Sequence, residues 1–225
     1  RNAVEEIVER EISSQAAWID SENAFPVDAL NALKQVGLLG LLLPEAHGGG
    51  GQDLLSFVLG VEAIAAVSPS TAWACVVHAS ASLGIATAGD QKQQEKFLPP
   101  LAAGNQLATF AFTEAGAGAD FNAIETNVTL GSEVYVLTGR KDFISLAGEA
   151  HVYVVLARTP REDGSSGLSM ILVEKDTRGF SIGSRRTGLG MRGISWGELV
   201  FDECQVPQEN LLGEFGRGMR VLFGM

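Results

Sequence analysis

The spacing of hydrophobic residues divides the chain into a first part with a helical period and a second part with a strand period. Within residues 2–20, apolar side chains recur every three to four positions and glutamates occupy the opposite face, which predicts an amphipathic helix. A second helix is predicted from Pro26 to Val36, because proline suits the first turn of a helix. Gly37 is typical of the position where a helix ends.

Two longer apolar segments predict two more helices. Residues 53–67 are apolar on nearly every side, which is typical of a buried helix. Residues 69–88 are rich in alanine and serine, and their helix would be capped by Ser70 or Thr71. His78 lies inside this segment, where a structural histidine is the simpler interpretation and a ligand is the alternative.

The helical period ends near Gly104, and a period of two follows. A last short helix is predicted over residues 90–98, closed by Pro99 and Pro100. Beyond it, alternating apolar and polar residues with many β-branched and aromatic side chains predict strands. The predicted strands are Leu107–Thr113, Glu125–Leu130, Tyr135–Lys141, Val152–Arg158, Ser169–Glu174 and Glu198–Phe201.

Turn-forming residues separate these strands, at 131–132, 148–149, 162–167 and 178–179. A block of helices followed by a block of successive strands indicates an α+β fold. We expect an all-helical N-terminal domain followed by an antiparallel β-barrel or sandwich-like domain. At residues 216–225 the pattern is helical again, like the beginning of another helix.

Composition and charge narrow the classes of partner. With 46% hydrophobic and 19% charged residues, the 225-residue chain can build a sizeable core. A formal net charge of -11 argues against nucleic acid, whose phosphates are bound by clustered lysine and arginine. Cys75 and Cys204 show neither a disulfide framework nor metal-ligand spacing, which suits an intracellular protein without a metal site. No segment has the ~20 uninterrupted apolar residues that span a bilayer, so we expect no membrane partner.

The segment Thr113–Asp120 is the first candidate for chemistry. Two glycines and several small residues follow an apolar strand there, so the backbone can come close to a ligand and direct several N–H groups at an anion. A plain glycine-rich turn is the alternative, since an isolated Gly-x-Gly pattern is weak evidence for a phosphate site. The other segments of the chain have to decide between the two interpretations.

Five segments, in a fixed order, resemble the motifs of one enzyme family. They are Gly40–Gly51, Lys96–Gly104, Thr113–Asp120, Gly139–Ser145 and Gly190–Pro207, the last followed by Asn210–Gly213. Together they make the sequence similar to the acyl-CoA dehydrogenases, flavoproteins that introduce an α,β double bond into acyl-CoA thioesters. In that family the segment Gly139–Ser145 corresponds to a strand with the pattern Gly-x-Lys-x-Trp-Ile-Thr.

The resemblance implies an N-terminal helical domain over residues 1–105, a central β-domain over 106–212 and the start of a C-terminal four-helix domain at 213–225. It also implies FAD as the cofactor, an acyl-CoA substrate of fatty acid metabolism, and an electron-transfer flavoprotein or a similar electron acceptor. Family members are usually homodimers or homotetramers of the cytoplasm or, in eukaryotes, of the mitochondrial matrix. The sequence is expected to be the first two domains of a longer protein and inactive alone, because the family's catalytic base lies in the C-terminal helical domain.

The family motifs imply a set of cofactor-binding residues. Thr113 and the backbone after it would face the pyrimidine end of the flavin, Phe143 would lie beside the isoalloxazine ring, and the Ser145 hydroxyl would reach near N5. The complete implied set is Phe110, Phe112, Thr113, Gly116, Gly118, Ala119, Phe143, Ile144 and Ser145. Ala119 and Trp73 would also bind the acyl-CoA substrate. Trp73 has two alternative interpretations: it closes the acyl pocket, or it is an ordinary core residue.

Three of these residues depart from the family pattern, since Ala119 stands for serine, Phe143 for tryptophan and Ser145 for threonine. The changes remove one hydroxyl donor and one indole N–H, and none of them excludes FAD. No catalytic residue is assigned within the chain, because Glu114 is interpreted as ordering the turn. The same scaffold would also suit a flavin-dependent monooxygenase or acyl-CoA oxidase, or a non-catalytic binding protein that has lost the flavin.

Overall fold

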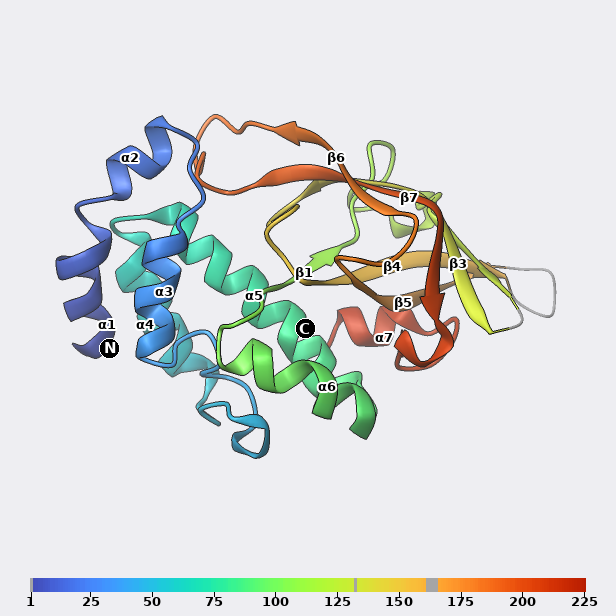
Figure 1. Ribbon diagram of the computed structural model, residues 1–225, viewed down its shortest axis with the longest axis horizontal. Coiled ribbons are helices and arrows are strands. Elements are labelled where there is room, and N and C mark those ends of the chain that lie inside the picture. Colours follow the sequence, from blue (N-terminus) through green and yellow to red (C-terminus); the bar gives the residue numbers. More distant parts are fainter. Residues whose placement is uncertain (1, 132, 161–165) are drawn as a thin grey trace.

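The computed structural model of the protein describes residues 2–131, 133–160 and 166–225. The helices and helical turns of its first part are α1 (Asn2–Ile7), η1 (Val8–Ile12), α2 (Ala16–Ser21), α3 (Val27–Gln35), η2 (Glu45–His47), α4 (Leu54–Ala65), α5 (Pro69–Ala88) and α6 (Gln91–Ala102). Helices α1 to α4 lie at one end of the molecule and the strands at the other, and α5 and α6 extend to the middle, below the strands (Figure 1). A helical part followed by a sheet is the arrangement that the sequence pattern predicts.

The helix predicted over residues 2–20 is broken into three pieces. After α1, the segment η1 is a π-helix, and a turn separates it from α2. The backbone N–H and the hydroxyl of Ser13 both donate to the carbonyl of Val8, at 2.9 and 2.8 Å, so the chain closes a wide turn instead of continuing as an α-helix. The apolar face still lies where the period predicts it, with Ile7 and Ile12 buried.

Helix α5 runs through the centre of the molecule between the other helices and the strands (Figure 1). It is long and apolar enough to cross a membrane by length and composition alone, but 12 of its residues are buried inside the protein, which accounts for its apolar surface. Its N-cap is Ser68 and not the predicted Ser70 or Thr71, because Pro69 occupies the first helical position. The Ser70 hydroxyl instead accepts a hydrogen bond from the N–H of Gly193 at 3.2 Å.

Helix α4 is covered on one side only, so the prediction of a buried helix over residues 53–67 is wrong. Phe57 and Ile64 are buried, whereas Leu55 and Val58 are 65% and 50% exposed. Apolar residues on every face of a helix make its sequence hydrophobic, but they do not determine which of those faces other elements cover. Only the packing against α1 and α5 decides which face of α4 is buried.

Helix α6 passes through Pro99 and Pro100 and continues to Ala102, so the predicted end at these prolines is also wrong. Its start is fixed by a capping box, and Leu98 and Leu101 on either side of the prolines are fully buried. Each proline removes one helical hydrogen bond. Burial of the two leucines in the core holds the last turn in place.

The strands are β1 (Ala108–Ala111), β2 (Asn127–Leu130), β3 (Val134–Ile144), β4 (Val152–Pro160), β5 (Ser166–Glu174), β6 (Phe180–Arg186), β7 (Trp196–Pro207) and β8 (Leu211–Leu212). They form one sheet in the order β6-β7-β3-β2-β4-β5-β8, and β1 pairs with β4. The six predicted strands are all present, and β6 and β8 are additional. Most pairs are antiparallel, as expected, but β1 runs parallel to β4, and a single parallel bridge joins β2 to β4.

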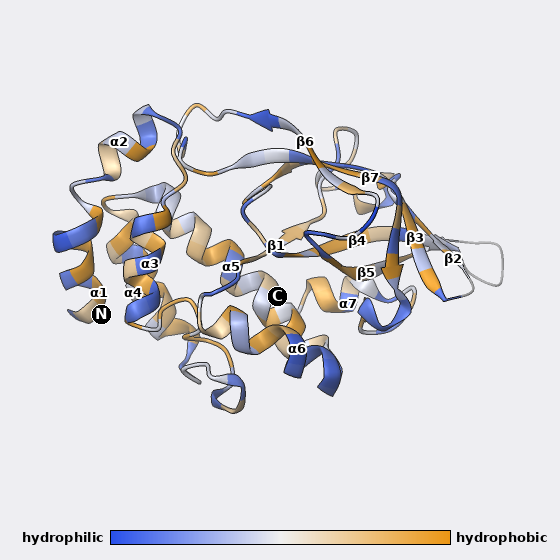
Figure 2. Ribbon diagram, viewed as in Figure 1, coloured by the Kyte–Doolittle hydropathy of each residue, from blue (hydrophilic) through white to orange (hydrophobic). Residues whose placement is uncertain are grey.

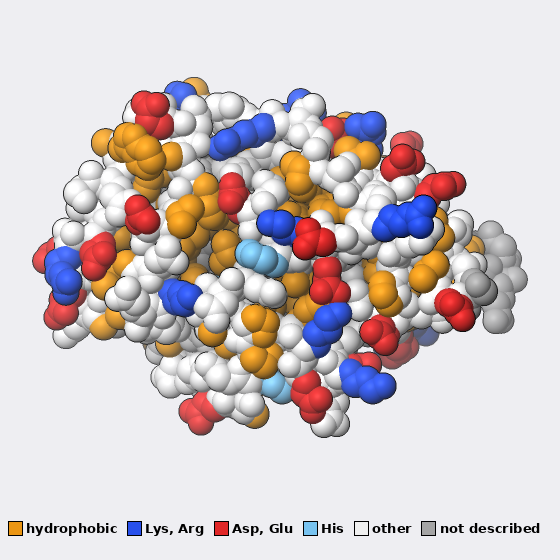
Figure 3. Space-filling model, in the orientation of Figure 1, with side chains coloured by type: hydrophobic (Ala, Val, Ile, Leu, Met, Phe, Trp, Pro, Cys, Tyr) orange, Lys and Arg blue, Asp and Glu red, His pale blue; other side chains and the backbone are white. Residues whose placement is uncertain are grey.

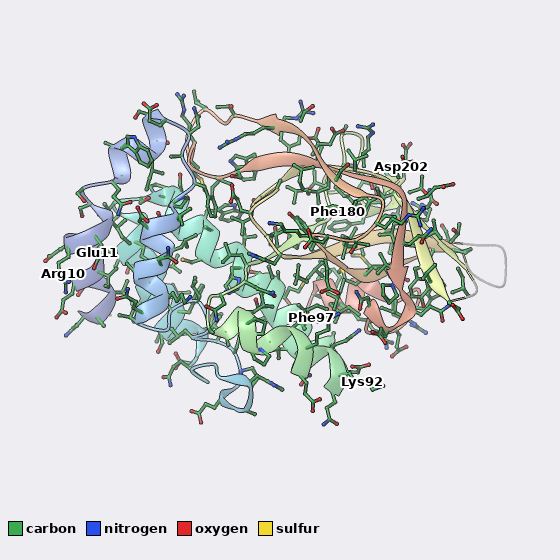
Figure 4. The ribbon with its side chains drawn as sticks, in the orientation of Figure 1. Arg10, Glu11, Lys92, Phe97, Phe180 and Asp202 are labelled. Atoms are coloured by element: carbon green, nitrogen blue, oxygen red, sulfur yellow. The ribbon has the colours of Figure 1, made fainter. Side chains whose placement is uncertain are left out.

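The sheet curls on itself, because side chains from distant strands meet across its concave face. The ring of Phe180 on β6 lies 4.8 Å from that of Tyr153 on β4, although β7, β3 and β2 separate these strands in the sheet. Phe180 also lies 5.4 Å from Phe201 on β7, and Figure 4 shows it inside the curve of the strands. This curvature gives the second part its barrel-like shape.

Two clusters of buried apolar residues join the helical part to the sheet. One contains Leu33 and Val77 from the helices with Tyr153 and Phe201 from the strands, and the other contains Leu98 of α6 with Val154 of β4. Figure 2 shows hydrophobic residues both on α5 and on the strands. The end of β6 and the connection to β7 reach back to the helical part, where Arg185 and Arg192 donate to the carbonyl and the Oδ1 of Asn23 at 2.7 and 3.0 Å.

The last helix, α7 (Gly218–Leu222), is shorter than the helical pattern over residues 216–225 indicates. It packs against α5 and β5, and its Val221 is buried. The turns predicted at 131–132 and 162–167 lie partly outside the described residues.

Candidate functional site

The loop after β1 is a tight turn that closes on itself. The N–H of Glu114 donates to the carbonyl of Ala117 at 2.9 Å, and the N–H of Ala117 donates back to the carbonyl of Glu114 at 3.1 Å. These two bonds place Ala115 and Gly116 at the exposed tip of the turn. The glycine-rich segment Thr113–Asp120 is therefore a defined turn and not an open loop.

Glu114 anchors this turn to the body of the sheet. Its carboxylate accepts bonds from the N–H groups of Glu125 and Thr126, at 2.7 and 3.0 Å, and from Nζ of Lys141 at 2.8 Å. Lys141 is fully buried and also donates to the carbonyl of Phe112 at 3.0 Å. Burial favours the neutral carboxyl, but the bonds from Lys141, Thr126 and Glu125 outweigh it and hold the pKa of Glu114 below its ordinary value. An acid with this many partners has a structural role.

The outer side of the turn offers unpaired backbone donors. In the described parts of the chain, no acceptor is bonded to the N–H groups of Ala115, Gly116, Gly118, Ala119 and Asp120. A Cβ atom on Gly116 or Gly118 would meet nothing within 4 Å, and neither residue has a positive φ. Neither packing nor backbone conformation therefore requires glycine here. Free donors beside open space favour a ligand-binding turn over a plain one.

Strand β3 ends in a distorted segment that exposes Phe143. Its pairing with β7 shifts between Lys141 and Ile144, as at a β-bulge. Phe143 has a φ of +56°, which bulky residues rarely adopt, and its side chain is 56% exposed. A strained backbone that presents an aromatic ring to solvent is typical of a functional position.

Asp142 and Arg186 hold this conformation of Phe143. Oδ1 of Asp142 accepts from the N–H of Phe143 at 2.8 Å, and the same carboxylate accepts from Nε and Nη2 of Arg186, at 3.0 and 2.8 Å. The guanidinium carbon of Arg186 lies 5.8 Å from the centre of the Phe143 ring. The bond from Arg186, opposed by burial and aided by the Phe143 N–H, holds the pKa of Asp142 below its usual range.

The two motifs lie side by side because the N–H of Asp142 donates to the carbonyl of Thr113 at 2.9 Å. On the strand that leads into the turn, the rings of Phe110 and Phe112 stack with their centres 5.0 Å apart. Segments about thirty positions apart in sequence are thus joined near the end of β3. This juxtaposition is the one that the family motifs imply.

Ser145 is fixed from two directions. The hydroxyl of Thr109 donates to the backbone carbonyl of Ser145 at 2.8 Å, and Nε1 of Trp73 donates to the Ser145 hydroxyl oxygen at 3.0 Å. Trp73 belongs to α5 and Ser145 follows the end of β3, so this bond links the helical part to the sheet.

The structure places the predicted site residues in three different surroundings. Gly116, Gly118, Ala119 and Phe143 are exposed, Thr113 and Trp73 are half-buried, and Ser145 is nearly buried. The side chain of Ile144 lies in the core, so only its backbone can reach a ligand.

Sequence reasoning missed Asp142, Arg186 and Thr109 as parts of this site. Asp142 and Arg186 are 44 positions apart, and no periodic signal pairs them. Lys141 does carry a signal in the sequence. A lysine at an inward-facing strand position predicts a buried partner for its charge. Of the described residues, no three His, Cys, Asp or Glu side chains are placed to hold a metal ion.

A cavity of about 690 Å³ opens beside the tip of the turn. It is lined by Gly116, Thr126, Asn127, Arg140 and Asp202, with the last labelled in Figure 4, and it contains neither Phe143 nor Ser145. Acidic and basic side chains are interspersed on the face shown in Figure 3, so that face carries no single-sign patch. The candidate site is therefore defined by the turn and the end of β3, and not by this cavity.

Comparison with known proteins assigns both parts of the chain to one family. Residues 1–105 match the acyl-CoA dehydrogenase N-terminal domain, and residues 109–204 match the acyl-CoA dehydrogenase middle domain. A short-chain specific acyl-CoA dehydrogenase of Clostridium acetobutylicum is 37% identical over 223 residues. The alignment covers 98% of this chain and 59% of that protein, so the chain spans little more than half the length of this relative.

Solved structures show the same likeness. Butyryl-CoA dehydrogenase from Megasphaera elsdenii superimposes with a TM-score of 0.92 at 31% identity, over 98% of this chain and 59% of that one. An acyl-CoA dehydrogenase complexed with FAD from Bacillus anthracis superimposes with a TM-score of 0.91 at 32% identity, over 99% of this chain and 38% of that one. The helical part, the curled sheet and their relative placement are thus common to all three proteins.

Proposed function

The chain belongs to the acyl-CoA dehydrogenase family, and from this membership we propose that it binds FAD and serves in the α,β-dehydrogenation of an acyl-CoA thioester. The observation that carries the proposal is the 2.9 Å hydrogen bond from the Asp142 N–H to the Thr113 carbonyl. This bond sets the glycine turn beside the exposed ring of Phe143 and the hydroxyl of Ser145. The activity is that of the whole protein, since the relatives are longer than this chain.

The residues present at this place fit a flavin. Phe143 offers an exposed ring against which an aromatic cofactor can pack, and Thr113 and Ser145 offer hydroxyl groups. The unpaired N–H groups of residues 115, 116 and 118–120 offer donors to an anionic group such as a pyrophosphate. Bound FAD would supply the acceptor for a hydride from the acyl β-carbon. Donors fixed by Glu114 and the turn would stabilise added negative charge without reorganising.

Removal of the acyl α-proton needs a base, and Glu114 does not take this role. Its oxygens are occupied by two backbone N–H groups and by Lys141, and its lowered pKa makes it a poor proton acceptor. We therefore assign the base to a part of the protein other than this site. The role of the described residues is to bind and orient the cofactor.

The proposed partners follow from the same family membership. They are an acyl-CoA as substrate and an electron-transfer flavoprotein or a similar protein as electron acceptor. A homodimer or homotetramer is proposed for the full-length protein.

A flavin titration followed by reduction with substrate tests the proposed function. The full-length protein, freed of cofactor, should quench FAD fluorescence on binding, and its bound flavin should bleach on anaerobic addition of a saturated acyl-CoA. Phe143→Ala should weaken FAD binding, whereas Trp18→Ala, a substitution at an equally exposed aromatic ring in α2, should not. Absence of FAD binding would contradict the proposal. Bleaching that is reversed by oxygen with rapid oxygen uptake would favour an oxidase or a monooxygenase instead.

A further inference from the structure

We propose that Trp73 is a positioning residue that fixes the direction of the Ser145 hydroxyl, so that its O–H is held as a hydrogen-bond donor for the flavin. The inference rests on the proposed function, because the flavin is the ligand that would receive this bond. It gives Trp73 a polar role that neither of the two sequence-based interpretations, pocket closure or ordinary core, contains.

The geometry of the contact defines which group donates. Nε1 of Trp73 lies 3.0 Å from Oγ of Ser145. An indole N–H can only donate, whereas a serine hydroxyl has one hydrogen to donate and two lone pairs that accept. Trp73 therefore occupies one of the lone pairs of Ser145. The hydroxyl hydrogen must point away from the indole, since two hydrogens cannot share this contact.

The hydrogen of the Ser145 hydroxyl has no acceptor within the described parts of the chain. The only bond in which Oγ takes part there is the one from Trp73, and Ser145 is 6% exposed, so bulk water supplies little compensation. Buried donors normally find an acceptor, because an unpaired one destabilises the folded state. A donor that is oriented and unpaired is suited to an acceptor atom of a ligand.

The backbone of Ser145 is held as firmly as its side chain. Thr109 donates to the Ser145 carbonyl at 2.8 Å, from the strand that leads into the glycine turn. The Trp73 contact adds a restraint from the helical part of the protein, 72 positions away in sequence. Because an accepted hydrogen bond polarises a hydroxyl, the bond from Trp73 also strengthens Ser145 as a donor.

Steric and polar roles of Trp73 can be separated by substitution. Trp73→Phe keeps a flat apolar side chain and removes the N–H, so it tests the hydrogen bond with little loss of bulk. Trp73→Ala removes both. If Trp73 only closed an acyl pocket, Trp73→Phe would leave FAD binding unchanged, and only Trp73→Ala would alter the preference for acyl length.

A double-mutant cycle on the full-length protein tests the proposal. Trp73→Phe and Ser145→Ala should each weaken FAD binding about threefold to tenfold, which is the size expected for one hydrogen bond. Both should shift the flavin absorption bands in the same direction. The double variant should bind no more weakly than Ser145→Ala alone, since the effect of Trp73 acts through Ser145. Ser145→Thr keeps a hydroxyl at this position, so Trp73→Phe should weaken FAD binding in the Ser145→Thr background as it does in the unmodified protein.

A measurement without flavin tests the contact itself. In protein labelled with 15N on the tryptophan indole, the N–H signal of Trp73 should exchange slowly with solvent in the cofactor-free state, and Ser145→Ala should accelerate its exchange and shift it. The corresponding signal of Trp18, which is 57% exposed, should exchange fast in both proteins, and Trp18→Phe assigns it. Melting temperatures of the cofactor-free variants confirm that each one is folded.

The outcomes separate this inference from the proposed function. Losses of FAD affinity that multiply in the double variant, or an indole signal that ignores Ser145→Ala, would overturn the role of Trp73 and leave FAD binding intact. Failure of the unmodified protein to bind FAD would overturn the proposed function and the inference with it.

Discussion

Nζ of Lys141 lies 2.8 Å from Oε1 of Glu114, and both side chains are buried where strand β3 passes beneath the glycine turn. The pair ties three segments together, because Lys141 also reaches the Phe112 carbonyl and Glu114 also receives the N–H groups of Glu125 and Thr126. A buried ion pair contributes little net stability when it replaces well-packed apolar groups, but the loss of one partner leaves a charge without compensation. The position of the turn therefore depends on both members of the pair.

We expect Lys141→Met to lower the free energy of unfolding by about 3–5 kcal/mol, because the Glu114 carboxylate would remain buried without its cation. Adding Glu114→Gln to this variant should recover part of the loss by removing the stranded charge. Urea unfolding at neutral pH measures both values. Lys96→Met is the matched control, since Lys96 pairs with Glu174 at 2.7 Å on the surface and should lose only about 0–1 kcal/mol. Equal losses at Lys141 and Lys96 would contradict the structural role of the buried pair.

The glycines of the turn provide a second prediction. Gly116→Ala and Gly118→Ala should leave the free energy of unfolding unchanged or raise it by about 0.4–1 kcal/mol, because a Cβ meets no neighbour and the unfolded chain loses entropy. Both should weaken FAD binding, since the methyl group would occupy the open space where the ligand would approach the backbone. Chemical denaturation and FAD titration give the two quantities.

Gly49→Ala is the control for these glycine substitutions. Its Cβ would overlap the carbonyl of Leu43, so the variant should lose stability without any direct effect on the turn. Destabilisation at Gly116 similar to that at Gly49 would mean that the turn requires glycine for packing. In that case the open space beside the turn would not be evidence for a ligand.

The elements that the sequence predicts well are those whose signal is local. The helical period of residues 69–88 and the alternation of residues 152–158 each lie within one element, and both elements are present. Strand β6 has no clear signal in the sequence. It is the terminal strand of the sheet and most of its residues are exposed, so it needs little alternation of apolar and polar residues. The end of α6 was misplaced because burial of Leu101 outweighs the local effect of two prolines.

The candidate site was predictable only as far as its motifs are continuous in sequence. The turn at 113–120 and the segment ending at Ser145 could be identified, and their adjacency follows from the family resemblance. The contacts that fix them could not, because Trp73 and Ser145 are separated by 72 positions and Asp142 and Arg186 by 44. Such pairs depend on how the sheet curls and on where α5 crosses it. The hydrophobic period within a single element contains no information about either.

His78 provides a prediction on pH. It is fully buried in α5, its Nδ1 accepts from the N–H of Ala108 at 3.1 Å, and burial lowers its pKa from 6.5 to about 4. The unfolded chain therefore binds a proton more readily than the folded protein between these two values, and stability rises with pH across this window. Lowering the pH from 7.5 to 5 should cost about 2 kcal/mol from this group alone.

The pH dependence can be assigned to His78 with one variant. His78→Asn keeps an acceptor near the position of Nδ1 and does not titrate, so its unfolding free energy should depend less on pH between 7.5 and 5. Burial also lowers the pKa of His151, but that contribution is the same in both proteins and cancels in the comparison. Identical slopes for the two proteins would show that His78 is not neutral and buried as the structure has it.

The strained backbone at Phe143 leads to the last prediction. Phe143 and Leu146 have nearly the same φ, +56° and +58°, but the ring of Phe143 is 56% exposed whereas Leu146 is fully buried. Asparagine tolerates this left-handed conformation better than either residue. Phe143→Asn should therefore raise the free energy of unfolding by about 1 kcal/mol and weaken FAD binding.

Leu146→Asn is the control and should instead lower the free energy of unfolding by about 2–5 kcal/mol, because its gain in backbone conformation is smaller than the loss of a buried leucine. If Phe143→Asn destabilised the cofactor-free protein, Phe143 would be held in place by packing within the chain, and its strain would carry no information about a ligand.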